Sequence, residues 1–219
     1  SSRVSDPTAL SNLLVKTGGL LSQPISGPSF LILNSQSRVQ TPCVVATANH
    51  VQSLLHLPVT TVDKQSENPI IEAVKALANT NTAAVLVIVD SNTYPPLLIA
   101  PESRWALVNV SALVDNAARS DVIAERTQKE IWRAFGYLMG AAHSNFSPCL
   151  MKTVLQPSDL DALKAKCLCP EPFNQIMLHC QKLGMKPSRM TTYRKAVEDG
   201  WAPAPTNDAQ RAIWTELKK

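Results

Sequence analysis

Apolar residues follow two different spacings along the first half of the chain. Ala83–Val89 is a continuous apolar run, which is typical of a strand buried on both faces of a sheet. Pro69–Ala78 instead begins with a proline and keeps its apolar residues on one helical face. The same reasoning predicts an alternating order of elements: strand Phe30–Leu33, helix Thr47–Leu57, strand Val59–Val62, helix Pro69–Ala78, strand Ala83–Val89, and short strands Leu97–Ile99 and Trp105–Val110.

Helical patterns dominate the second half. Ser120 or Asp121 is expected to cap a long helix that runs to about Ala142, because an inward-facing apolar stripe follows it. Strands that alternate with helices, followed by helices alone, indicate an α/β fold: a mixed sheet with packed helices and a helical C-terminal extension. Four shorter helices are predicted after the long one, at Ser158–Lys166, Pro172–Leu183, Ser188–Asp199 and Thr206–Lys218.

These patterns divide the chain into three parts. Residues 1–28 carry Ser, Pro and Gly around one apolar patch and are expected to form an arm. Residues 29–183 are expected to form the α/β domain, and residues 184–219 the helical extension.

Composition narrows the class of protein. The chain has 219 residues, of which 45% are hydrophobic and 17% charged, so it can bury a core. Its net charge of +4 is thinly spread, which disfavours a nucleic-acid surface. No apolar run is long enough for a membrane span, and no glycine-rich phosphate loop is present. We expect no small-molecule substrate.

The segment Arg133-Ala-Phe-Gly-Tyr-Leu-Met-Gly-Ala-Ala-His143, with Cys149-Leu-Met151 behind it, carries the most informative pattern. It resembles the metzincin signature H-E-x-x-H-x-x-G-x-x-H with its later Met-turn, in the form found in archaemetzincin-type zinc peptidases. Trp105–Ser111 resembles that family's strand before the active-site helix, and Glu125–Glu130 resembles the run that leads into the motif. The resemblance implies a metzincin-like fold, with Met151 buried beneath the end of the long helix.

The chemistry of that motif is altered. A catalytic zinc of this type needs three imidazoles and a glutamate, but Arg133, Ala134 and Tyr137 stand at the first histidine, the glutamate and the second histidine. We expect no catalytic residue and no enzymatic activity, that is, a pseudoenzyme of a metallopeptidase fold. The alternative is an active zinc-dependent metallopeptidase with non-standard ligands. The former active-site positions are Arg133, Ala134, Tyr137, His143 and Met151.

Two side chains at these positions invite more specific expectations. Arg133 can pair with Glu130, three residues before it, or hold His143 neutral. We expect His143 to be hydrogen-bonded under the sheet rather than to bind a metal.

The cysteines raise a second candidate site. Cys149, Cys167 and Cys169 could hold a structural zinc, form a disulfide between two of them, or remain free thiols. No other cofactor is expected. Cys43 is expected on a strand edge in the core, and Asp159 and Asp161 are expected to cap a helix.

The C-terminal part favours a role in assembly. Gly200–Thr206 alternates Pro with Ala and should be a stiff linker. We expect Trp201, within the linker, and Trp214, after it, to bind a partner. The alternative is that this segment packs back onto its own domain. The main hypothesis is a structural or accessory subunit of a larger protein assembly, with other protein subunits as partners. The alternative is a nucleic-acid-contacting subunit of a ribonucleoprotein.

The first residues bear on location. Ser1-Ser-Arg could be the stub of a cleaved transit peptide. We therefore expect the mitochondrial matrix or the cytoplasm.

Overall fold

A five-stranded mixed sheet forms the centre of the computed structural model, with strand order β2-β1-β3-β5-β4. The structure describes residues 27–35, 41–115, 119–145, 149–163, 168–186, 208 and 211–212. β4 is antiparallel to β5, and the other neighbours are parallel. The strands are β1 (Ser29–Asn34), β2 (Val59–Asp63), β3 (Thr82–Val89), β4 (Leu97–Ala100) and β5 (Trp105–Asn109).

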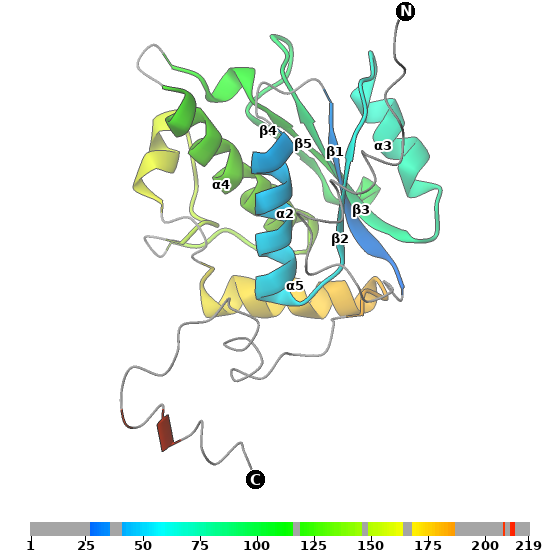
Figure 1. The fold of residues 1–219 in the computed structure, drawn as a ribbon, viewed down its shortest axis with the longest axis vertical. Helices are drawn as coiled ribbons and strands as arrows, with labels where there is room; N and C mark the ends of the chain where they lie inside the picture. The colour runs from blue at the N-terminus through cyan, green and yellow to red at the C-terminus, as the bar shows by residue number, and fades with distance from the viewer. Residues whose placement is uncertain are drawn as a thin grey trace, which may run out of the picture.

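Helices cover both faces of the sheet (Figure 1). α2 (Thr41–Leu55) and α4 (Ser120–Leu138) pack on one face, and α3 (Pro69–Leu77) packs on the other. β3, in the middle, is buried along its whole length, as its continuous apolar sequence requires. α5 (Pro170–Lys182) runs across one end and adds Ile176 and Cys180 to the larger core. Three short 3-10 turns complete the described elements: η1 (Pro101–Ser103), η2 (Ser111–Leu113) and η3 (Pro157–Ala162).

The predicted fold class is confirmed, since the strands and helices occur in the expected order. Several boundaries differ. α4 is capped by Arg119 in an extended conformation rather than by Ser120 or Asp121. It ends at Leu138 instead of Ala142, because Gly140 adopts a φ of +80° that a right-handed helix cannot contain.

Two further expectations about local structure were wrong. Ser158–Lys166 was expected to be an ordinary helix, but the structure has the 3-10 turn η3 at Pro157–Ala162. Cys43 was expected on a strand edge, yet it lies half-buried in the first turn of α2.

Other expectations fall largely outside the described residues. These are the arm at residues 1–28, the helices Ser188–Asp199 and Thr206–Lys218, and the side chains of Trp201 and Trp214. The division into three parts stays a prediction. No helix within the described residues is long and apolar enough to cross a membrane.

Candidate functional site

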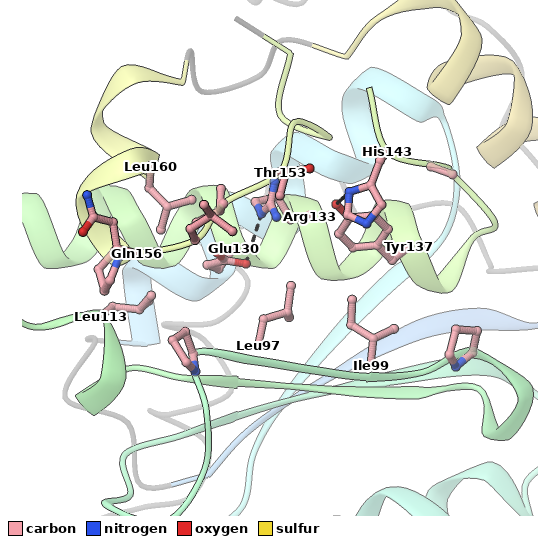
Figure 2. Close-up of a pocket in the computed structure, with 16 residues that line it drawn as sticks. Leu97, Ile99, Leu113, Glu130, Arg133, Tyr137, His143, Thr153, Gln156 and Leu160 are labelled. Carbon is pink, nitrogen blue, oxygen red and sulfur yellow. Dashed lines mark hydrogen bonds and ion pairs between the residues drawn. The ribbon is translucent and has the colours of Figure 1, made fainter. Parts of the chain in front are cut away.

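A cleft of about 490 Å³ separates α4 from the edge strand β4 (Figure 2). One wall comes from β4 and its flanking prolines, and the opposite wall comes from residues 153–157 and Leu160. The α4 residues Glu130, Arg133 and Tyr137 lie between the walls and form the floor. Of the former active-site positions, Arg133, Tyr137 and His143 line the cleft.

Arg133 ties α4 to the turn that contains Met151. Its Nη1 donates to the carbonyl oxygens of Leu150 at 2.6 Å and Lys152 at 2.5 Å. Its Nε lies 3.4 Å from Oε2 of Glu130, one helical turn earlier. The guanidinium is buried, and its hydrogen bonds to the two carbonyls and its ion pair with the Glu130 carboxylate offset the cost of burying its charge. The expected pairing with Glu130 is confirmed.

Glu130 is the most buried charge in the floor. Burial raises the pKa of its carboxyl, and the positive charge of Arg133 lowers it in part. Oε2 of Glu130 and Nε of Arg133 are both buried without a hydrogen-bond partner among the described residues.

Tyr137, rather than Arg133, contacts His143. The Tyr137 hydroxyl lies 2.9 Å from Nδ1 of His143, and its ring lies 5.6 Å from the Arg133 guanidinium carbon. Burial raises the pKa of the Tyr137 hydroxyl, with the Arg133 charge opposing it. His143 is exposed at the mouth of the cleft, so the expectation of a histidine under the sheet was wrong. It emerges after Gly140 has ended the helix.

Met151 lies where the Met-turn resemblance predicts it. It is fully buried, and a Cβ built on Gly136 of α4 would lie only 2.6 Å from its sulfur. The Met151 carbonyl also accepts a hydrogen bond from the Ser144 N–H at 3.0 Å. The predicted contact between Met151 and the end of the helix is confirmed.

The side chains at the former ligand positions do not fit the zinc site of a metzincin. A guanidinium is protonated and offers no lone pair, and Arg133 is already bonded to two carbonyls. Ala134 is fully buried in the core and has no group to accept a proton. His143 supplies one imidazole. Over the described ranges, no group of three His, Cys, Asp or Glu side chains is placed to hold a metal.

The second candidate set is partly assembled. Cys149 is buried, and Cys169 lies beside Ser144 with Oγ and Sγ 3.6 Å apart. Burial raises the pKa of the Cys149 thiol, but hydrogen bonds from Cys169 and from backbone N–H groups outweigh it, and the net pKa is lowered. Neither cysteine is in a disulfide in this structure, and Cys167 lies outside the described residues. The structural zinc stays a prediction.

Sequence reasoning missed how the far wall is fastened to α4. Arg126 is buried and donates from Nε and Nη2 to the two carboxylate oxygens of Asp161, at 2.8 and 2.7 Å. Lys129 donates to the Leu160 carbonyl at 2.9 Å. Asp161 was expected to cap a helix, but it is an ion-pair partner, while Asp159 caps as expected through its bonds to the N–H groups of residues 155 and 156. The spacing of Arg126, Lys129 and Arg133 at three and four residues was the available signal.

The near wall is an open strand edge. The Asn109 N–H donates to the Pro96 carbonyl at 3.0 Å, and this bond determines which residues of β4 are hydrogen-bonded to β5. Backbone groups alternate in direction along an antiparallel strand, so Leu98 pairs with β5 while the N–H and C=O groups of Leu97 and Ile99 point away from it. β4 is the last strand of the sheet among the described residues, so these groups lie along its open edge.

The mixed sheet, the long helix α4 and the turn with Met151 beneath it together define a metzincin-like fold. The chain is similar to the solved structure of a zinc-dependent peptidase from Methanocorpusculum labreanum, with 17% identity, a TM-score of 0.55, and coverage of 67% of this chain and 99% of the peptidase. It is likewise similar to archaemetzincin from Methanopyrus kandleri, with 18% identity, a TM-score of 0.56, and coverage of 72% and 98%. No protein-family model and no curated protein sequence matches the chain.

These likenesses confirm the archaemetzincin-like fold and correct one expectation. We expected a chain that is not an enzyme, but its structural neighbours are zinc-dependent peptidases, so the fold is that of an enzyme class. Replacement of the motif histidines does not establish that the chain is inactive.

Proposed function

We propose that the chain is a structural or accessory subunit of a larger protein assembly. In this proposal it holds an extended segment of a neighbouring protein in the cleft beside β4. The observation that carries the proposal is the open edge of β4 beside the cleft, where the backbone groups of Leu97 and Ile99 point away from β5. An extended peptide that adds to such an edge gains main-chain hydrogen bonds, and pockets beside it select alternate side chains.

The walls of the cleft suit a bound chain. Leu97 and Ile99 present half-buried apolar side chains on the near wall, and Val154 does so on the far wall. Leu155 lies at the far rim with 89% of its surface exposed. Contact of an aliphatic side chain with water is unfavourable in free energy, so covering Leu155 would favour binding. A segment lying between β4 and residues 153–157 would cover Leu155 and the edge together.

The cleft is also held in a fixed shape. Arg126 and Lys129 fasten the far wall to α4, and Arg133 fastens the Met151 turn to the same helix. A preformed cleft loses little conformational entropy when a partner binds, which favours a stable association.

The test removes one donor from the open edge. Ile99→Pro deletes an N–H that points away from β5, so the sheet should keep its ladder, because proline is tolerated on an edge strand. Ile99→Val is the matched control. Each full-length chain, with a photo-crosslinking residue in place of Leu155, is purified from its native source with whatever it binds.

We expect the control to retain a partner that crosslinks through position 155, and Ile99→Pro to lose it with an unchanged circular dichroism spectrum. A partner that survives Ile99→Pro would remove β4 from the interface. A control chain that purifies alone would contradict the role as a subunit.

A further inference from the structure

The outer face of α3 is apolar although it is exposed. Ile71 and Val74 lie one helical turn apart and are 49% and 55% exposed, and Ile70 and Leu77 are half-buried beside them. A helix on the surface of a globular protein normally carries polar residues on its outer side, and a helix that is apolar all round is normally covered all round. α3 therefore has the composition of a buried helix with one face still open.

The charged groups of α3 are already paired. Glu72 accepts hydrogen bonds from Lys64 at 2.5 Å and from Lys75 at 3.0 Å. Because these cations compensate its carboxylate, the open face offers aliphatic contact rather than charge. The segment that suits this face is an apolar one.

The chain contains an apolar segment of the right kind at residues 10–21, which lie outside the described residues. They read Leu-Ser-Asn-Leu-Leu-Val-Lys-Thr-Gly-Gly-Leu-Leu, so half of them are leucine or valine. Leu10, Leu13 and Leu14 follow the spacing that places apolar side chains on one face of a helix.

This segment is tethered close to α3. The Ser29 N–H, at the start of β1, donates to the Asn81 carbonyl at 2.8 Å, just after the end of α3 (Figure 1). Residues 22–28 can span at most about 24 Å, whereas α3 is about 14 Å long. A segment on so short a tether acts at an effective concentration in the millimolar range, which favours it over a separate chain of similar affinity.

We propose that residues 10–21 fold back over the outer face of α3 and pack against Ile71 and Val74. The N-terminal segment then extends the smaller core, which lies on the opposite face of the sheet from α4 and the cleft. Leucine side chains displace water from the aliphatic surface of α3, and the free energy gained is proportional to the apolar area that they cover.

The test places a photo-reactive benzoylphenylalanine at position 74 of the full chain. Position 178 is the matched control, because Leu178 is also an exposed aliphatic residue on a helix, α5. Isotope-labelled and unlabelled chains are mixed before irradiation, and mass spectrometry identifies the crosslinked peptides. A crosslink within one chain carries one isotope pattern, and a crosslink between two copies carries both.

We expect position 74 to crosslink to residues 10–21 of the same chain, and position 178 not to do so. Leu13→Ser combined with Leu14→Ser should lower the yield of that crosslink severalfold, because the segment loses two aliphatic contacts. Lys16→Gln keeps the leucines and should leave the yield unchanged. Thermal unfolding of each variant controls for loss of the fold.

The other outcomes contradict the proposal. Crosslinks at position 74 that carry both isotope patterns would mean that a second copy covers α3. Crosslinks to another part of the chain, or none, would remove residues 10–21 from this face. A yield that is equal at position 178, or unaffected by the two serine substitutions, would mean that the segment makes no specific contact with α3.

Discussion

At the scale of single residues, Gly136 and Met151 decide how closely α4 approaches the turn beneath it. A methyl group on Gly136 would lie 2.6 Å from the sulfur and 2.9 Å from the terminal carbon of Met151, which is fully buried. Gly to Ala inside a helix normally stabilises by up to about 1 kcal/mol. Overpacking costs about 1–3 kcal/mol. We expect Gly136→Ala to destabilise the fold by about 1–2 kcal/mol in urea unfolding, because the clash outweighs the helix propensity.

A double-mutant cycle isolates that contact. Met151→Ala alone should cost about 2–5 kcal/mol through the cavity it leaves. In the double variant the new methyl occupies part of that cavity, so the total should be smaller than the sum of the two single effects. Additive effects would mean that the two residues do not touch.

The same scale shows which parts of the site the sequence could predict. Met151 and the pairing of Arg133 with Glu130 follow from fixed spacing along one helix and its turn. The roles of Asp161 and His143 do not. Asp161 meets Arg126 across 35 residues, and His143 turns out to solvent because Gly140 ends the helix early. Such long-range partners depend on tertiary packing, which local patterns do not encode.

At the scale of elements, Arg126 joins η3 to α4. Its guanidinium is buried and bonded to Asp161, with Asp115 at 2.9 Å and the Leu113 carbonyl at 2.9 Å as further partners. The hydrogen bonds from Arg126 lower the pKa of the Asp161 carboxyl, although burial opposes them. The far wall of the cleft is thus held by an ion pair with one buried and one half-exposed member.

This arrangement predicts a dependence of stability on pH. Because the folded pKa of Asp161 lies below its unfolded value of about 3.9, its contribution is complete above that value and is lost as the pH falls through the folded pKa. We expect Asp161→Asn to lower stability at neutral pH by about 1 kcal/mol, a value reduced for solvent screening. The difference from the unmodified chain should shrink in acid, as urea titrations below about pH 4 would show.

A surface ion pair provides the control. Asp121 pairs with Arg119 at 2.9 Å, and both side chains are exposed. Asp121→Asn should follow the unmodified chain at every pH, since exposed pairs contribute little. If Asp161→Asn also runs parallel to the unmodified chain down to strong acid, the Arg126 pair does not hold the wall.

Element prediction succeeded where burial alone sets the pattern. β3 is apolar throughout because both faces are covered, and the spacing of apolar residues placed α3 and α4. Boundaries were less accurate, since the two ends of α4 depend on an extended Arg119 and a left-handed Gly140 rather than on apolar spacing. The position of β4 at the edge of the sheet follows from the strand order, which the spacing of apolar residues does not predict.

At the scale of the whole molecule, the described hydrophobic core ends at Met185, before the C-terminal residues. Met185 is buried and donates from its N–H to the Cys180 carbonyl at 3.0 Å, just after the end of α5. Of the later described residues, Asp208, Arg211 and Ala212 are exposed. The core as described therefore includes no side chain beyond Met185.

Residues 200–219 are predicted to attach the chain to a partner. They carry the Pro-Ala-Pro linker with Trp201 and Trp214, and stiff linkers lose little entropy when they dock on a partner. We expect the chain without residues 200–219 to keep its circular dichroism spectrum and its cooperative unfolding, because no part of the described core is removed. We also expect it to be lost from its assembly, or to bind much more weakly, in pull-downs compared with the full-length chain.

Combining Ile99→Pro with the truncation tests whether the cleft and the tail are two separate attachments. If both bind the partner, each single change should weaken the complex, and the two together should abolish it by loss of bivalent attachment. A truncated chain that unfolds would place the tail in the core, and one that binds unchanged would leave the cleft as the sole attachment.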